Sequence, residues 1–314
     1  MLDRYPGPPA VSETSVTGAV LAAARDHAAR RGDRPALACP GEEVGYARFA
    51  ATVPAAADGM RRLGVRPGDV AAVHLAGACD LALAVHAVTA AGAVPAPLPL
   101  DGGVGDLAAA LTETGARFLF TARGTSARSL AAAERSFVRQ VFAFGDVPGT
   151  TPFARLVRTG AHAAPAEPLP GPAADPLRDL ALLLNGPAGE VSHADRLADL
   201  YRLGGTVGLS DGDVLVCCGR DCTPSTWIGL IDLCLTHGAT FAGVRDPDVA
   251  ALLAAVRDRA ATAAVVTPAK LRALTFDHDP VPVPGVRLLV TGAAPPEVVQ
   301  ACRVRHGWTV TPLG

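Results

Sequence analysis

Lysine is almost absent from this sequence, because Lys270 is the only one among 314 residues. Any chemistry that needs a catalytic lysine therefore has a single candidate. A complete Walker loop, G-x-x-x-x-G-K-[ST], is excluded because that lysine follows an alanine. Aromatic residues make up only 4% of the chain, which argues against stacking platforms for nucleic-acid bases.

No excess of charge of either sign is present, since 28 basic residues face 30 acidic ones and the net charge is −2. Scattered and balanced charge indicates no nucleic-acid partner. The seven cysteines are odd in number and widely spaced, as expected of reduced thiols in a cytosolic protein.

Long hydrophobic segments are also scarce. The longest uncharged run, 81–100, contains His86, Gly92 and three prolines, so we expect a helix, a glycine stop and a short strand rather than a membrane span. Prolines and charges stand at the N-terminus where a signal peptide would be apolar. These patterns predict a cytoplasmic protein without a membrane partner.

The chain alternates helical and strand patterns, which predicts an α/β fold with mostly parallel sheets flanked by helices. A stretch rich in proline and alanine, 161–178, lacks apolar periodicity and is typical of a linker. We therefore expect a first α/β subdomain over 1–160 and a second over 179–314.

One segment, LALLLNGPAGEVSHADRL (180–197), has the pattern of a phosphate-binding loop: an apolar strand, a glycine turn and a helix. The turn contains no lysine, no arginine and no hydroxyl before Ser192. Ser192 and Asp195 also fit a capping box at the start of the helix.

Two clusters could ligate a metal ion. The first comprises Cys217, Cys218 and Cys222, with Cys234 and His237 further along. Neighbouring residues of a strand point to opposite faces, so buried and inert thiols are the favoured interpretation. The second cluster, Asp277–Asp279 around His278, fits an ordinary loop equally well. We predict no metal site.

Five segments, in this order, resemble the N-terminal domain of the adenylate-forming enzymes, the acyl-CoA synthetases and their relatives. The segments are RPALACPGEEVGYARFA, LGVRPGDVAAVHLAGACDLALAVHAVTAAGAVPAPL, LTHGATFAGV, VTPAKLRAL and VRLLVTGAAPPEVVQACRVRHG. The resemblance covers nearly the whole chain and implies the same two-part α/β fold. The abundance of alanine and arginine indicates a GC-rich coding sequence of the actinobacterial kind.

In that family, segment 180–197 falls on the phosphate signature "YTSGTTGxPKGVxxTHxN", and here it is shorter by about five residues. The part that carries "PKG" is missing, and Glu190 adds a negative charge. The family's "YGxTE" magnesium motif and its C-terminal domain with the catalytic lysine have no counterpart within the sequence. The family's aromatic-His pair falls on Cys222 and Thr223, and Lys270 stands where the family has no catalytic lysine, so we expect it to be a solvated side chain.

The resemblance implies no catalytic residue, but a vestigial pocket for a nucleotide or acyl group. Its expected lining is Asn185, Gly186, Gly189, Ser192, His193, Thr223, Gly292, Ala293, Ala294 and Pro295. Its expected ligands are AMP or an acyl-adenylate, and ATP with magnesium is not expected.

The favoured hypothesis is a non-catalytic homologue of an acyl-CoA synthetase-type enzyme, acting in binding, scaffolding or regulation, with secondary metabolism as the setting. A protein partner or a second copy would cover the surface that the family's C-terminal portion occupies. The alternative hypothesis is half of a split ligase that converts ATP and a carboxylic acid to acyl-AMP with a second chain. A degraded protein without a role is a third hypothesis.

Overall fold

The computed structural model describes residues 15–161, 175, 177–185, 189–279, 283 and 285–313. It contains two compact units that interleave along the chain. The first unit comprises residues 1–22, 51–74 and 84–202, and the second comprises 23–50, 75–83 and 203–314. Most of the predicted linker, 161–178, lies outside the described residues.

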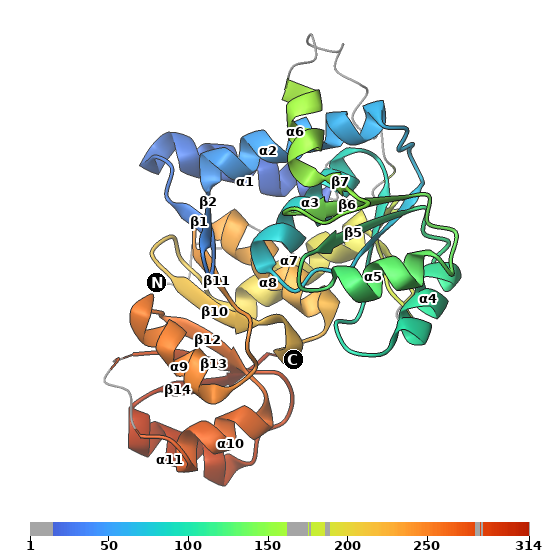
Figure 1. Ribbon diagram of the computed structural model, residues 1–314. Helices are drawn as coiled ribbons and strands as arrows, with labels where there is room; N and C mark the ends of the chain where they lie inside the picture. The colour runs from blue at the N-terminus through green and yellow to red at the C-terminus, as the bar shows by residue number, and fades with distance from the viewer. Residues whose placement is uncertain are drawn as a thin grey trace. The chain divides into compact units, whose positions relative to one another are not determined.

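The first unit contains a parallel five-stranded sheet with the order β4-β3-β5-β6-β7 (Figure 1). Leucine and alanine side chains from α4 and α5 bury against β3 and β5, and Leu111 and Leu119 are fully buried there. A separate antiparallel pair, β8 and β9, belongs to the same unit. The strands are β3 (Val70–Val73), β4 (Val94–Pro97), β5 (Phe118–Ala122), β6 (Gln140–Phe144), β7 (Thr151–Pro152), β8 (Leu180–Leu183) and β9 (Glu190–Ser192).

The second unit contains a seven-stranded sheet with the order β14-β13-β12-β10-β11-β1-β2, parallel except for the β1–β2 pair. Strands and helices alternate along the chain. Each connecting helix returns the chain to the end of the sheet where the previous strand began, so the next strand runs parallel to it. The strands are β1 (Pro35–Cys39), β2 (Glu42–Gly45), β10 (Val214–Cys218), β11 (Thr240–Val244), β12 (Ala263–Val266), β13 (Arg287–Val290) and β14 (Thr309–Pro312).

Helices cover the sheets as the sequence pattern predicts. Four of them, α1, α2, α3 and α7, contain residues of both units. The helices are α1 (Val16–Arg31), α2 (Tyr46–Arg62), α3 (Ala78–Ala90), α4 (Val104–Glu113), α5 (Ser126–Ala133), α6 (Phe153–Ala161), α7 (His193–Val207), α8 (Pro224–His237), α9 (Val249–Asp258), α10 (Pro268–Phe276) and α11 (Pro296–His306).

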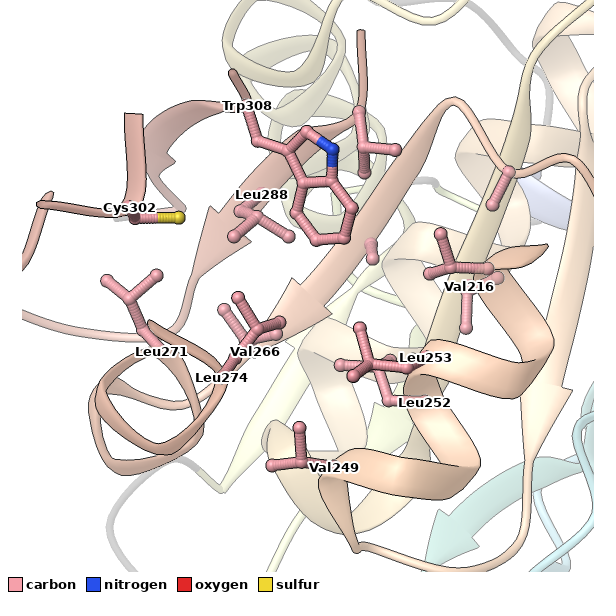
Figure 2. Packing of buried hydrophobic residues seen from close by; sticks show 14 of the residues in the cluster. Val216, Val249, Leu252, Leu253, Val266, Leu271, Leu274, Leu288, Cys302 and Trp308 are labelled. Atoms are coloured by element: carbon pink, nitrogen blue, oxygen red, sulfur yellow. The ribbon is translucent and has the colours of Figure 1, made fainter. Parts of the chain in front are cut away.

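A core cluster of the second unit lies between one face of its sheet and helices α9, α10 and α11 (Figure 2). Trp308 is the largest side chain of this cluster and is 1% exposed. Its indole N–H donates to the carbonyl oxygen of Val283 at 2.7 Å, which satisfies the one polar atom of a buried tryptophan.

The observed units differ from the predicted division into 1–160 and 179–314. Strand β1, from the first part of the sequence, pairs with β11, with Leu37 opposite Phe241. The helix–strand alternation identifies the elements, but it does not specify which sheet each strand joins. A strand early in the chain therefore completes the sheet of the later half.

Candidate functional site

The segment with the phosphate-loop pattern is a β-hairpin. Strands β8 and β9 pair with Leu183 opposite Glu190, and the N–H of Leu184 donates to the carbonyl oxygen of Gly189 at 2.8 Å. Gly189 has φ +39°, a conformation that glycine adopts readily. Sequence analysis predicted a strand, a turn and a helix, and it missed the three-residue strand β9, which is too short to show periodicity. Residues 184–189 connect the two strands, and four of them, 185–188, lie between the hydrogen-bonded Leu184 and Gly189.

This four-residue connection offers few groups to an anion. Pro187 has no backbone N–H, and the four residues contain no hydroxyl and no cation. Glu190, which follows the turn, is exposed and carries a negative charge. Phosphate sites depend on several converging N–H donors and on positive charge. The predicted site residue Gly186 lies outside the described residues.

The hydroxyl of Ser192 is engaged at the start of helix α7. It accepts a hydrogen bond from the N–H of Asp195 at 3.1 Å and donates to Asp195 Oδ2 at 2.7 Å. The N–H of Ser192 donates to the same carboxylate at 3.1 Å. These hydrogen bonds lower the pKa of the Asp195 carboxyl. The predicted capping box is confirmed.

His193 is buried beside the start of α1. The N–H of Val16 donates to its Nδ1 at 3.4 Å, and the side chain is 3% exposed. Burial, together with the nearby Arg196 charge, lowers the pKa of His193. The imidazole is therefore neutral at pH 7 and provides no cation for a phosphate.

A cavity of about 90 Å³ lies beside the beginning of the short loop, in the first unit. His74, Arg128 and Asn185 are among its lining residues. The Oδ1 atom of Asn185 is buried and has no hydrogen-bond partner in the described part of the chain. Asn185 is thus the one predicted residue of the loop whose side chain faces a cavity.

His74 of this cavity was not predicted as a site residue. Its Nδ1 lies 2.9 Å from Ser129 Oγ, and its side chain is 1% exposed. Burial and the charge of Arg128 lower the pKa of His74 to about 4. The signal in the sequence is a histidine directly after a buried strand, where parallel sheets place functional side chains.

In the second unit, the strand order reverses at β10, which has β11 on one side and β12 on the other. Ligands of open α/β sheets bind beyond the carboxyl ends of the strands at such a point. Here Lys270 Nζ forms an ion pair with Asp221, and the two side chains are 11% and 3% exposed. Burial raises the pKa of Asp221, and Lys270 acts in the opposite direction.

The expectation of a solvated Lys270 was therefore wrong. Lys270 does lie in the first turn of α10, where its N–H donates to Thr267 Oγ1 at 3.2 Å. Its side chain extends to the carboxylate of Asp221, however. The helix start was visible in the sequence, but the acidic partner comes from a different loop and was not.

The other predicted site residues lie at the same edge of this sheet. Thr291 Oγ1 donates to the carbonyl oxygen of Asp221 at 2.8 Å, so the loop after β13 is fastened to the turn after β10. Thr223 Oγ1 accepts from the N–H of Thr226 at 3.2 Å and caps helix α8. Gly292 has φ +119°. Gly292, Ala293 and Pro295 are exposed, and Ala294 is half-buried.

The thiols of the first proposed metal cluster are mostly buried. Cys217 Sγ lies 3.9 Å from Cys222 Sγ. Among the residues that the structure describes, no three His, Cys, Asp or Glu side chains are grouped as a metal ion requires. Within the same residues, no helix combines the length and the apolar character needed to cross a bilayer.

The sequence also contains GLSDG, 208–212, which matches G-x-S-x-G. In a hydrolase that motif joins a strand to a following helix. Here it joins helix α7 to strand β10, and Ser210 Oγ donates to Asp213 Oδ2 at 2.8 Å. This serine belongs to a turn and is not presented as a nucleophile.

Two mostly parallel sheets flanked by helices form the α/β fold that the sequence resemblance implies. Comparison with known proteins agrees, because residues 24–183 match the family described as AMP-binding enzyme. The chain belongs to this family. Salicyl-AMP ligase / salicyl-S-ArCP synthetase of Mycobacterium tuberculosis is 32% identical over an alignment of 305 residues, covering 90% of this chain and 53% of that protein.

Two solved structures show the same fold. The apo structure of Mycobacterium smegmatis MbtA has a TM-score of 0.76 and 24% identity, covering 94% of this chain and 55% of that one. The N-terminal domain of FACL13 from Mycobacterium tuberculosis has a TM-score of 0.74 and 14% identity, covering 93% of this chain and 74% of that one. The chain thus spans about half the length of the salicyl-AMP ligase and of MbtA.

Proposed function

We propose that this chain is a non-catalytic homologue of the adenylating enzymes, which keeps their α/β scaffold for a binding, scaffolding or regulatory role. The observation that carries the proposal is the hairpin closed by Leu184 and Gly189. It leaves four connecting residues without a hydroxyl or a cation. The residues present do not fit ATP with magnesium, so no reaction step is assigned to them.

Binding of the ATP triphosphate depends on several charge-assisted contacts. Each charge-assisted hydrogen bond to a phosphate contributes roughly 1.5–3 kcal/mol. Losing one electrostatic stabiliser of a transition state lowers a rate by about 10²–10³. This loop lacks several at once, and Glu190 repels an anion. Lys270 does not compensate, because its ammonium group is paired with Asp221.

A ligand without the triphosphate fits the remaining features better. The loop of residues 292–295 is small and exposed, and the hydrogen bond from Thr291 to Asp221 holds it at the strand-order reversal. Backbone contacts with adenine need no special side chain. We propose AMP or an acyl-adenylate as its ligand, and a cytoplasmic role in secondary metabolism with a protein partner or a second copy.

Thermal unfolding with separate ligands tests this proposal. The protein is heated with ATP·Mg, AMP, CoA or a non-hydrolysable salicyl-AMP analogue. A ligand at a hundred times its Kd stabilises a fold by about 2.7 kcal/mol, a shift of a few degrees. We expect AMP or the analogue to raise the unfolding temperature, and we expect ATP·Mg to raise it by no more than AMP does. A larger shift with ATP·Mg would contradict the proposal.

One observation favours a second candidate, an aryl-adenylating ligase that is complete only with further polypeptide. The likeness to the salicyl-AMP ligase extends over 90% of this chain but over only 53% of that protein. Salicylate-dependent pyrophosphate exchange, measured with this chain alone and mixed with the remaining half of that ligase, tests it. Exchange only in the mixture would support this candidate.

A further inference from the structure

A second cavity is lined only by residues of the second unit. It has a volume of about 30 Å³ and lies where strand β1 ends, helix α3 begins and strand β11 ends. Five of its lining residues can ionise: Cys39, Glu42, Cys79, Asp80 and Arg245. Neither the fold nor the proposed function accounts for this grouping.

The two thiols of this cavity contact each other at the start of α3. The N–H of Cys79 donates to Cys39 Sγ at 3.2 Å, and the two thiol groups also share a hydrogen bond. Gly243 permits this approach, because a Cβ there would lie 2.9 Å from the Ala78 Cβ and 3.3 Å from Cys39 Sγ. The fold therefore places one sulfur against a helix N-terminus and another sulfur beside it.

These hydrogen bonds shift the pKa values of the two thiols in opposite directions. Hydrogen bonds from the Cys79 thiol and backbone lower the pKa of Cys39, although burial opposes the change. The same interaction raises the pKa of Cys79, which donates to Cys39 and receives no comparable stabilisation. Because Cys39 Sγ accepts the N–H of Cys79 at the start of α3, Cys39 is the group that reacts first, and Cys79 reacts second.

The cavity lining also includes a carboxyl group that can carry a proton, that of Asp80, and a positive charge, that of Arg245. Burial and the nearby Glu42 raise the pKa of Asp80 to about 7, and Arg245 acts in the opposite direction. Asp80 can therefore both accept and release a proton near neutral pH. The charged groups around the thiols are Glu42 on β2, Asp80 on α3 and Arg245 after β11.

We propose that Cys39 and Cys79 form a dithiol site that reduces hydrogen peroxide and becomes a disulfide. The cavity of about 30 Å³ leaves room beside the two sulfurs for a small oxidant such as hydrogen peroxide. A molecule of two heavy atoms fits after modest movement of the side chains.

The reaction balances with the groups on hand. The Cys39 thiolate, whose proton is on Asp80, attacks one peroxide oxygen and breaks the O–O bond. Cys39 becomes a sulfenic acid, and the leaving hydroxide takes the Asp80 proton to form water. Asp80 then accepts the Cys79 proton, and the Cys79 thiolate attacks Cys39 Sγ. The departing hydroxide takes that proton to form a second water, so two thiols and one peroxide give one disulfide and two waters.

Peptide mapping of the full chain tests this proposal without any substitution. The reduced protein is treated with one equivalent of hydrogen peroxide, and the remaining thiols are alkylated. We expect loss of two of the seven thiols and a peptide pair joined through Cys39 and Cys79. Oxidation that begins at Cys222, with Cys39 and Cys79 still reduced, would overturn the proposal.

Three variants then assign the steps. In Cys79→Ser, the reaction stops at a Cys39 sulfenic acid that dimedone traps, and in Cys39→Ala the Cys79 thiol stays reduced. Asp80→Asn slows peroxide consumption at pH 7 by about 10²-fold, the usual contribution of a proton-transfer group. Cys222→Ser is the matched control, since Cys222 is the most accessible cysteine, and it still loses the same two thiols. A Cys39→Ala protein that consumes peroxide at the wild-type rate would contradict the assignment.

Discussion

At the residue scale, the buried ion pair of Lys270 and Asp221 is the most consequential departure from expectation. A chain that contains a single lysine uses it in a pair whose side chains are 11% and 3% exposed. Taking both charges out of water is costly, and their attraction offsets the penalty only while both are present. The pair fixes the turn after β10 to the start of α10.

A double-mutant cycle measures this coupling. Lys270→Met leaves the Asp221 carboxyl buried without its cation, and Asp221→Leu leaves the ammonium group unpaired. Each single variant should lose about 3–5 kcal/mol of unfolding free energy. The double variant should regain most of that loss, because no buried charge remains. Urea unfolding gives all four values, and additive losses would show that the two groups are not coupled.

A second prediction at this scale concerns acid stability through His74. Its pKa is about 4 in the folded protein and about 6.5 when unfolded, so the unfolded state binds more protons between these values. The stability that neutral His74 contributes is complete above about pH 6.5. It is lost as the pH falls through 6.5 toward 4, and amounts to about 3 kcal/mol.

Urea midpoints measured at about pH 7.0, 5.5 and 4.5 check this contribution, because these conditions run from above the unfolded pKa of His74 to near its folded pKa. His74→Gln should lose less stability than the wild type between the first and last condition. His278→Gln, a half-buried histidine of the second unit, is the matched control and should behave as the wild type. Equal pH dependence in all three proteins would refute the role of His74.

At the scale of elements, the hairpin β8–β9 and the start of α7 form the segment that resembles the family's phosphate loop. The connection is short, and the next hydroxyl, that of Ser192, is committed to Asp195. The connection turns the chain between β8 and β9, and Ser192 at the end of β9 caps helix α7.

Removal of this cap gives a prediction for the element. Ser192→Ala should lower the unfolding free energy by about 1 kcal/mol, because the N–H of Asp195 in the first turn loses its acceptor. Ser126→Ala is the control, since the Ser126 hydroxyl bonds the carbonyl of Arg123 and caps nothing; we expect a change within about 0.5 kcal/mol. Affinity for AMP should be the same in Ser192→Ala as in the wild type. A weaker affinity would give Ser192 a role in binding.

The elements show how far sequence reasoning reaches. The alternation of helical and strand patterns predicted the α/β class, and the apolar run 81–100 predicted the helix and short strand that are α3 and β4. Sequence reasoning missed β9, which has three residues, and the pairing of β1 with β11, because sheet partners depend on contacts distant in sequence. The shortened loop was visible directly. The cavities around His74 and Cys39 were not, since each combines residues from separate segments.

At the scale of the whole molecule, the two units interleave, and the chain passes between them five times. The seven-stranded sheet of the second unit takes β1 and β2 from residues 35–45. A fragment that begins at residue 179, the boundary suggested by the proline-rich stretch, therefore lacks two strands. Strand β11 becomes an unprotected edge in that fragment.

Truncation tests this organisation. The fragment 179–314 should aggregate or lack cooperative unfolding, as followed by size exclusion and circular dichroism. Mixing it with the fragment 1–178 should restore a soluble complex, because the missing strands return. A soluble, cooperatively folded 179–314 fragment would mean that the sequence-based boundary is an independent domain boundary after all.

The central claim is that this member of the AMP-binding enzyme family has lost its triphosphate site. Calorimetric titration of the full chain with ATP·Mg and with AMP tests it most directly, because the two ligands differ only in the groups that the loop would hold. The account predicts that ATP·Mg binds no more tightly than AMP. An affinity for ATP·Mg about tenfold or more above that for AMP, equal to about 1.4 kcal/mol from the added phosphates and metal, would contradict it.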